Sequence, residues 1–192
     1  VAANYGDIGD DAVDLSYSNS ASTTRGATGD YSIAMGSFTE ASGSYSTAMG
    51  YLTTAGYGST AMGRSTSATG NSSTAMGDGT TASGFFSTAM GYSTEASSGF
   101  STAMGQSTTA SGISSTAMGA STKASDYGSL VIGQYNSSGS TVTNSATVFN
   151  AANTAFVIGN GVDGSNTSDA FKVLFNGDAT VGNDLTVSGD VV

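Results

Sequence analysis

The side chains of this sequence that could do acid–base or nucleophilic chemistry are carboxylates and hydroxyls, because the chain has no histidine and no cysteine. A general base would have to be a carboxylate or a lysine. The 14 acidic residues are spread along the chain, and no serine has a base at a spacing typical of an activated nucleophile. Thiolate metal sites are excluded outright. We therefore expect no catalytic residues, no cofactor and no enzymatic activity.

One group of carboxylates is close together in the sequence, namely Asp7, Asp10, Asp11 and Asp14. Carboxylate oxygens are ligands that Ca²⁺ prefers, so this group could hold the ion. Its spacing matches no calcium loop, however, and the glycine-rich nonapeptide repeat of calcium-binding β-rolls is absent. A solvated acidic loop is the simpler interpretation, and we predict no metal site.

Charge and hydropathy exclude two further classes of partner. The formal net charge is −10, and the four basic residues, Arg25, Arg64, Lys123 and Lys172, are scattered. A basic patch that could follow a phosphate backbone is therefore missing, and we expect no nucleic-acid partner. No apolar run approaches the roughly 18–20 residues of a membrane-spanning helix, so we expect no membrane insertion of this segment.

Two sets of side chains recur at regular spacing and could bind a ligand. Large aromatic residues precede several copies of the motif Ser-Thr-Ala-Met-Gly, and four of them form a candidate ligand-binding ridge: Tyr45, Phe85, Phe86 and Phe100. Packing between subunits explains these aromatics equally well. A threonine ladder could present the flat lattice of hydroxyls and methyls that ice-binding solenoids use: Thr47, Thr60, Thr74, Thr88, Thr102 and Thr116.

These side chains are positioned by a repeat of 14 residues, shortened once to 13. Its central column is Met35, Met49, Met62, Met76, Met90, Met104, Met118 and Ile132. Glycine follows each member of the column, and a second alanine lies seven residues after the first. Seven residues suit a short strand and a tight turn, and are too few for a helix with its turns. Each unit therefore predicts one coil of a parallel β-solenoid, with coils stacked about 4.8 Å apart.

The alternation of side chains along a strand decides which columns face inward. The two alanine columns are small and nearly invariant, so we place them opposite each other in a thin interior. The methionine column then faces outward as an apolar stripe, which soluble monomers rarely expose. An interior of alanine alone also recovers little of the roughly 1–2 kcal/mol per residue of backbone entropy lost on folding. We predict a homo-oligomer that packs along the methionine column.

The two ends depart from the repeat. We divide the chain into an irregular start or degenerate coil at 1–30, a β-roll of 14-residue repeats at 31–134, a connector with β-strands at 135–177, and a stalk at 178–192. The stalk has a period of six residues, which favours a narrow β-prism or β-helix built by several chains. That period is carried by Asp178, Asp184 and Asp190.

The unit Ser-x-Ala-Met-Gly-x-x-Thr-x-Ala-x-Gly resembles the YadA-like head repeat of trimeric autotransporter adhesins, from about Tyr31 to Gln134. This resemblance implies an all-β, left-handed parallel β-roll that forms a homotrimer, with the Met/Ile column at the trimer interface. Methionine replaces the family's usual isoleucine in seven of the eight copies. The connector and the six-residue period look instead like stalks of phage tail fibres and large bacterial surface proteins.

We therefore expect an extracellular fibre or adhesin head segment at a cell or particle surface. It would act as a structural spacer, and could adhere to a host or cell-surface glycan or protein through its outer turns. Two alternatives stay open: a receptor-binding tail fibre of a phage or contractile injection system, and an ice-binding β-solenoid. The sequence departs from an ordinary globular composition, with only 9% charged residues, and it is expected to be a piece of a longer protein.

Overall fold

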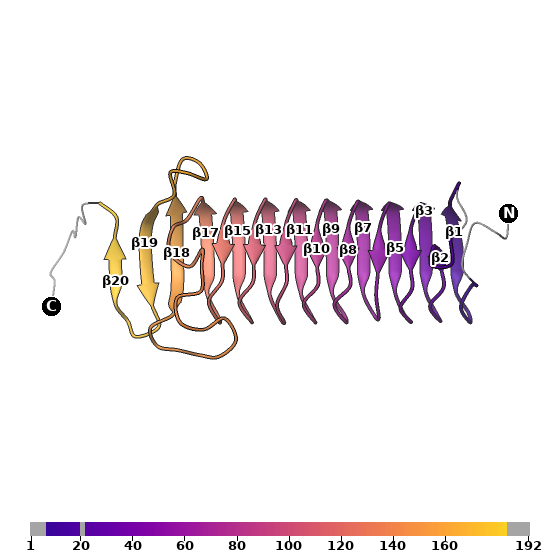
Figure 1. Cartoon of the computed structure of the whole chain (residues 1–192), viewed down its shortest axis with the longest axis horizontal. Helices are drawn as coiled ribbons and strands as arrows, with labels where there is room; N and C mark the ends of the chain where they lie inside the picture. The colour runs from indigo at the N-terminus through magenta and orange to yellow at the C-terminus, as the bar shows by residue number, and fades with distance from the viewer. Residues whose placement is uncertain (1–6, 20–21, 184–192) are drawn as a thin grey trace, which may run out of the picture.

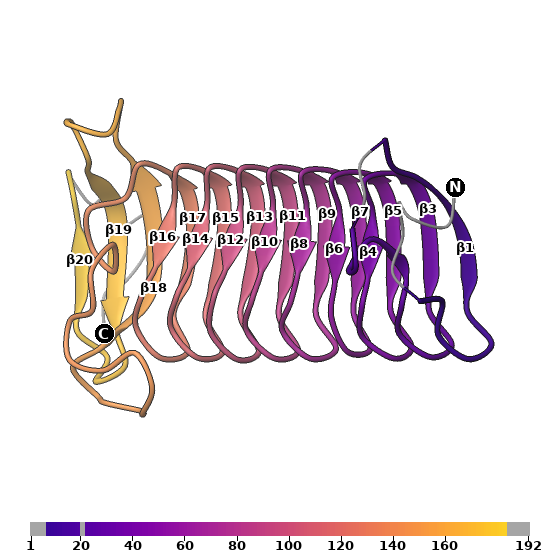
Figure 2. The same cartoon turned by 45° about the vertical axis from the view of Figure 1, so that its right-hand side comes forward.

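The computed structural model describes residues 7–19 and 22–183. Every regular element in these residues is a β-strand, and the coils stack in a row to form a rod (Figure 1). Strand β1 lies at one end of the rod and β20 at the other, and the coils between them repeat with even spacing (Figure 2). The predicted all-β parallel solenoid of about 14 residues per coil is confirmed.

Each coil contributes one long strand and one two-residue strand. The long strands are β1 (Val13–Tyr17), β3 (Ile33–Ser37), β5 (Thr47–Tyr51), β7 (Thr60–Arg64), β9 (Thr74–Asp78), β11 (Thr88–Tyr92), β13 (Thr102–Gln106), β15 (Thr116–Ala120) and β17 (Leu130–Gln134). The short strands are β2 (Gly26–Ala27), β4 (Glu40–Ala41), β6 (Thr54–Ala55), β8 (Ser67–Ala68), β10 (Thr81–Ala82), β12 (Glu95–Ala96), β14 (Thr109–Ala110) and β16 (Lys123–Ala124). We call the two layers the long sheet and the short sheet.

Parallel pairing keeps equivalent residues of neighbouring coils directly beside each other. Between β9 and β11, for example, Ala75 lies opposite Ala89 and Met76 opposite Met90. The 13-residue coil keeps this register in both sheets, because Met49 still pairs with Met62 and Ala55 with Ala68. Its missing residue falls in the turn between the short and the long strand, where a change of length is absorbed without shifting either sheet.

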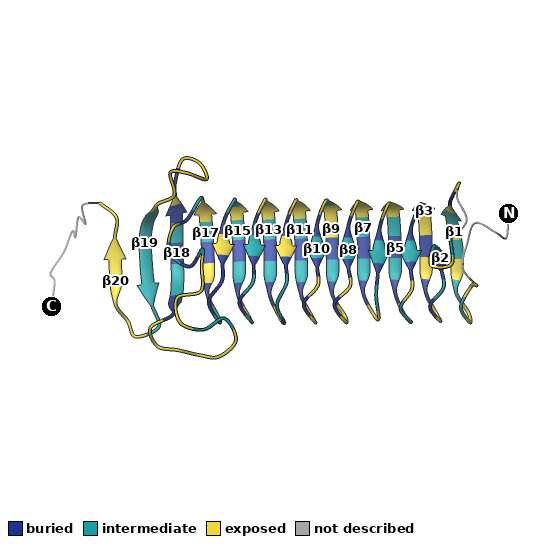
Figure 3. Cartoon of the chain, in the orientation of Figure 1, coloured by how far each residue is buried: buried dark blue, intermediate teal, exposed yellow. Residues whose placement is uncertain are grey.

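Buried residues recur at the same place in successive strands, as the banding of Figure 3 shows, and in the regular coils they are small residues in columns. All the alanines of both columns from Ala27 to Ala124 have no exposed surface. The expectation of an alanine-only interior was wrong, because a serine column and a threonine column are also buried. In Thr53-Thr54-Ala55 the alternation turns the first threonine and the alanine inward together, so Thr53 is fully buried.

The buried serines and threonines differ in how their hydroxyls are satisfied. Ser59 donates a hydrogen bond of 2.7 Å to the Gly56 carbonyl, and several other serines of its column bond to backbone carbonyls, whereas the hydroxyls of Ser32 and Ser46 have no partner among the described residues. The threonine hydroxyls have no protein partner among the described residues. They are those of Thr39, Thr53, Thr66, Thr80, Thr94, Thr108 and Thr122.

At the start of the rod, β1 and β2 form a first coil that is longer than the others. β1 pairs with β3 in parallel, with Val13 opposite Ile33, a separation of 20 residues along the chain. Ala27 pairs with Ala41 and is fully buried. The segment before Tyr31 therefore contributes strands to both sheets.

At the other end the short sheet stops at β16 and the long sheet continues. The long sheet adds β18 (Thr154–Asn160), which pairs with β17 in parallel, then β19 (Asp169–Leu174) and β20 (Ala179–Val181), which pair antiparallel. The predicted stalk begins with β20, but Asp184 and Asp190 lie outside the described residues, so its six-residue period stays a prediction.

The segment between β17 and β18 closes this end of the rod. Fully buried Asp126 accepts hydrogen bonds from the backbone nitrogens of Thr143, at 2.6 Å, and Thr154, at 2.8 Å. Asn153 is also buried, and its side chain bonds to both backbone groups of Ser145. The connector is thus tied to the last coil by buried polar side chains.

Candidate functional site

The methionine column lies on the outer face of the long sheet. Because each intervening alanine is fully buried, its neighbours along the strand point outward. Met35 is 40% exposed and Met76 is 37% exposed, and the other members of the column are half-buried. Ile132 continues the column opposite Met118. The column therefore forms an unbroken stripe along the rod, and its contact with another subunit stays a prediction.

The threonine ladder shares this face with the methionines. Thr74 and Met76 flank Ala75 on the same strand, and Thr74 pairs in register with Thr60 and Thr88. These threonines are half-buried. The outer face of the long sheet thus presents a hydroxyl column beside a thioether column. It is not a surface of threonine alone.

The aromatic side chains form two separate groups in the turns before the long strands. The tyrosine cluster is Tyr31, Tyr45 and Tyr57, and the phenylalanine cluster is Phe85, Phe86 and Phe100. Tyr45 stacks on Tyr31 with ring centres 5.3 Å apart, whereas Phe86 stacks on Phe100 at 5.5 Å. The coil between the two clusters has Asn71 and Ser72 in this turn. The four predicted ridge residues are therefore divided between two patches.

The backbone of this turn is unfavourable for large side chains. The residue before each serine of the buried column has a positive φ, which is 62° at Tyr45, 54° at Phe86 and 58° at Phe100. Other coils place Gly58 or Gly128 there. A non-glycine residue in this region costs on the order of 1–2 kcal/mol. Contacts between rings recover roughly 0.5–1.5 kcal/mol per pair, so the isolated chain gains little from aromatics at this position.

The acidic cluster does not form a metal site in the structure. Among residues 7–19 and 22–183, no three His, Cys, Asp or Glu side chains come together in a way that could hold an ion. Asp14 instead accepts a hydrogen bond from the backbone nitrogen of Ser16. Asp10 donates its own backbone nitrogen to the Asp30 carboxylate at 3.1 Å. These carboxylates shape the turns of the first coils.

Two exposed charged groups have shifted pKa values with local causes. Arg64 forms an ion pair with Asp78 of the next coil, and this hydrogen-bonded carboxylate raises the pKa of Arg64. The pKa of Asp163 is lowered, first by the hydrogen bond from the Asn166 side chain and then by the backbone nitrogens of Ser165 and Asn166. Both interactions hold the shape of the rod's surface.

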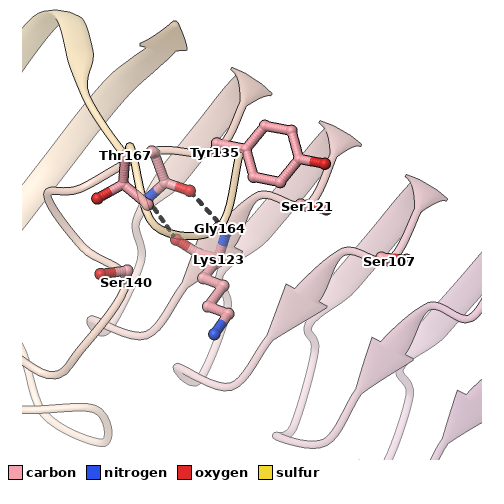
Figure 4. A pocket seen from close by; sticks show the side chains of 8 residues that line it. Ser107, Ser121, Lys123, Tyr135, Ser140, Gly164 and Thr167 are labelled. Atoms are coloured by element: carbon pink, nitrogen blue, oxygen red, sulfur yellow. Dashed lines mark hydrogen bonds between the residues drawn. The ribbon is translucent and has the colours of Figure 1, made fainter. Parts of the chain in front are cut away.

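A pocket of about 470 Å³ lies where the regular coils meet the connector (Figure 4). It is lined by Ser107, Ser121, Lys123, Tyr135, Asn136, Ser140, Gly164 and Thr167. This pocket could not be predicted from the repeat, because its wall comes from two non-periodic segments, one before β18 with Ser140 and one after it with Gly164 and Thr167. One signal was available: Lys123 is the sole basic residue in a column that otherwise contains Gly, Glu, Thr and Ser.

The described residues contain no helical segment with the length and hydrophobicity of a membrane span. The candidate surfaces of the described residues are thus a half-exposed apolar stripe, two aromatic clusters and a pocket lined by hydroxyls, a lysine and a tyrosine.

Comparison with known proteins agrees with the periodicity. The family model described as the YadA head domain repeat, which spans two copies, matches residues 27–53, 55–80, 82–108 and 110–136. A search of curated proteins gave no match. Each matched segment covers two coils of the solenoid, so the family's unit and the structural unit coincide. Since these segments make up more than half of the 192 residues, the chain belongs to the YadA head repeat family.

Proposed function

We propose that this chain is a segment of an extracellular, homotrimeric fibre of the adhesin type, which holds a binding region away from a cell or particle surface. The observation that carries the proposal is the continuous, half-exposed Met/Ile stripe on a solenoid of the YadA head repeat family. The solenoid supplies stiffness, and the stripe supplies a surface along which chains can pack.

The stripe suits a subunit interface in its energetics. Full burial of a methionine side chain contributes roughly 1.5–3 kcal/mol. At the 40% exposure of Met35, covering the remaining surface would contribute about 0.6–1.2 kcal/mol. The contribution recurs in every coil, because the stripe is continuous. Methionine is also unbranched, so it can adapt to the side chains of a second chain.

The oligomeric state is tested by the mass of the chain in solution, which is 18.8 kDa for the monomer. We expect three times that mass. Met76→Glu places a charge in the stripe and should reduce the trimer, because a buried carboxylate without a partner is strongly unfavourable. The matched control is Thr81→Glu on the short sheet, where Glu40 and Glu95 occupy the equivalent position.

Two results would contradict this proposal. One is a monomeric wild-type chain over the micromolar range. The other is a Met76→Glu variant that assembles as well as Thr81→Glu. Both variants keep the inward columns unchanged, so circular dichroism should show an intact solenoid in each.

We propose in addition that the aromatic clusters contact other molecules. Their rings are between 47% and 60% exposed and stand on a strained turn, a combination that gains free energy once a partner covers the rings. Replacing Phe85 and Phe86 by serine separates two roles. Loss of the trimer assigns the phenylalanines to subunit packing, whereas an intact trimer with lost adhesion assigns them to a ligand.

The two alternative functions have less support. A receptor-binding tail fibre would share the rod and the trimer, and would differ in the domains that flank this segment. Ice binding needs a regular hydroxyl and methyl surface, whereas Thr74 and its equivalents share their face with methionines. Thermal hysteresis no greater than that of buffer is the result we expect.

A further inference from the structure

The pocket at the end of the regular coils is built from one turn position and one returning loop. Ser107, Ser121 and Tyr135 are equivalent residues of three successive turns, with φ values of 53°, 52° and 42°. Each of their backbone nitrogens donates to the carbonyl of the last residue of the preceding coil's long strand, at 2.8–3.1 Å. One side of the pocket is therefore lined by Ser107, Ser121 and Tyr135 from three neighbouring coils. Gly164 and Thr167 of the returning loop complete the wall (Figure 4).

The walls of the pocket are fixed by hydrogen bonds within the chain. The buried Asn136 side chain accepts a hydrogen bond from the backbone nitrogen of Lys123 at 2.8 Å and donates one to the Lys123 backbone carbonyl at 3.0 Å, as the dashed lines of Figure 4 mark. It also donates to the Ser138 carbonyl at 2.6 Å. Gln134 holds the returning loop through the Gly161 carbonyl at 2.8 Å. A ligand would therefore meet a preformed site, which lowers the entropy lost on binding.

The charge of the pocket comes from Lys123. Its side chain is exposed, and it takes part in no ion pair among the described residues. Asp163 and Asp169 of the surrounding loops keep their charge, but they hydrogen-bond to uncharged groups of their own loops and form no ion pair with Lys123. Asp163 accepts from Ser165 and Asn166, and Asp169 accepts from the backbone and hydroxyl of Ser137. The Lys123 ammonium is left to meet a ligand.

We propose that this pocket binds a carboxylated sugar unit. A volume of about 470 Å³ is in the range of small-molecule sites, and its hydroxyls both donate and accept hydrogen bonds, as sugar hydroxyls require. The Tyr135 ring offers an apolar face for the C–H groups of a sugar ring. One ammonium matches one carboxylate, whereas a polyanion would be repelled by a chain with net charge −10.

This inference names a ligand class for the proposed fibre but uses a site apart from the aromatic clusters. The pocket is formed within a single chain, so its occupancy can be measured whether or not the chain is trimeric. A trimer that binds none of the sugars would contradict sugar binding in the pocket but would agree with the trimeric fibre. A monomer that binds the sugar would contradict the trimeric fibre but would agree with sugar binding in the pocket.

The test is a titration of the full chain with glucuronate, N-acetylneuraminate and glucose, and binding is measured by ligand-observed saturation-transfer NMR. Glucose carries a hydroxymethyl group where glucuronate carries its carboxylate, so the pair isolates the charge. We expect at least one acidic sugar to bind on the order of tenfold more tightly than glucose, and to weaken as salt is added. The tighter of the two acidic sugars identifies the source of the carboxylate.

Three variants locate the binding. Lys123→Gln should reduce the affinity for the acidic sugar to that for glucose, whereas Lys172→Gln, outside the pocket, should leave it unchanged. Tyr135→Ser should abolish binding of glucose and of the acidic sugars, because it removes the ring on which a sugar would lie. The fold should stay intact, since Ser107 and Ser121 occupy this turn position in earlier coils. Equal affinity for glucose and both acids, no binding by any of the three sugars, or an unaffected Lys123→Gln variant would overturn the proposal.

Discussion

Two glycines of one coil offer a sharp test of how the rod is stacked. Gly77 ends the strand motif of β9, and its φ is +125°, a region that L-residues rarely adopt. A Cβ added there would clash with the Gly91 carbonyl oxygen of the next coil and lie 2.9 Å from its carbonyl carbon. Gly79 stands two residues later with a φ of +64°. A Cβ there would make ordinary van der Waals contacts with Ser93, the nearest being its hydroxyl oxygen at 3.6 Å.

The structure therefore predicts very different costs for the same substitution. Gly79→Ala should lower the free energy of unfolding by about 1 kcal/mol, the strain of alanine at a left-handed position. Gly77→Ala adds roughly 1–3 kcal/mol of strain, and the clash forces neighbouring coils apart, which weakens ladder hydrogen bonds worth about 1 kcal/mol each. We expect a total of about 4 kcal/mol.

Thermal unfolding followed by circular dichroism measures the difference. For a chain of this size 1 kcal/mol corresponds to roughly 2–4 °C, so the midpoint should fall by about 3 °C for Gly79→Ala and by about 12 °C for Gly77→Ala. Solenoids can unfold in parts, and hydrogen exchange of β9 and β11 should show the loss locally. Midpoints within 2 °C of each other would refute the argument that close stacking dictates the glycine column.

Three further predictions concern other features of the rod. Thr80→Val should leave the protein as stable or stabilise it by about 1 kcal/mol in calorimetry, because it removes a buried hydroxyl that has no protein partner in the described residues; a loss of stability would show that the hydroxyl is bonded. Asp126→Asn should destabilise the connector by about 2–3 kcal/mol, seen as faster exchange of the Thr143 and Thr154 amides, since one of the two accepting oxygens becomes a donor. The turn held by Asp163 should be intact at neutral pH and open as the pH falls through the lowered pKa of this carboxyl, below its ordinary 3.8; amide shifts of that turn that stay constant down to pH 2 would contradict the assignment.

The repeat made most of the fold predictable. Strand alternation and the 14-residue period placed the alanine columns correctly, because one small residue per strand must fill a thin interior. The same alternation applied to Thr53-Thr54-Ala55 also turns Thr53 inward, although buried polar groups usually have hydrogen-bond partners. Equivalent threonines lie side by side in successive coils and are almost fully buried. The geometry of the coil therefore buries these hydroxyls even though they have no partner among the described residues.

The surfaces were predictable in part. The outward position of Met76 follows from that of Ala75, whereas the separation of Tyr45 from Phe86 depends on the coil between them, which contributes Asn71 and Ser72. The left-handed backbone of that turn was not visible in the sequence. It is dictated by the tight connection into the next strand and is shared by tyrosine, serine and glycine alike.

The pocket could not be predicted from the repeat, for a reason that applies to repeat folds in general. A periodic surface offers every ligand the same shallow groove many times, so a concave site with its own chemistry needs an interruption of the period. Here the interruption is the segment after Gln134, which leaves the short sheet without a further strand and returns across the turns of the last coils. Lys123 breaks the composition of its column in the last coil before that segment. The repeat accounts for stiffness and packing along the rod, and the place where the repeat ends is where a selective binding site becomes geometrically available.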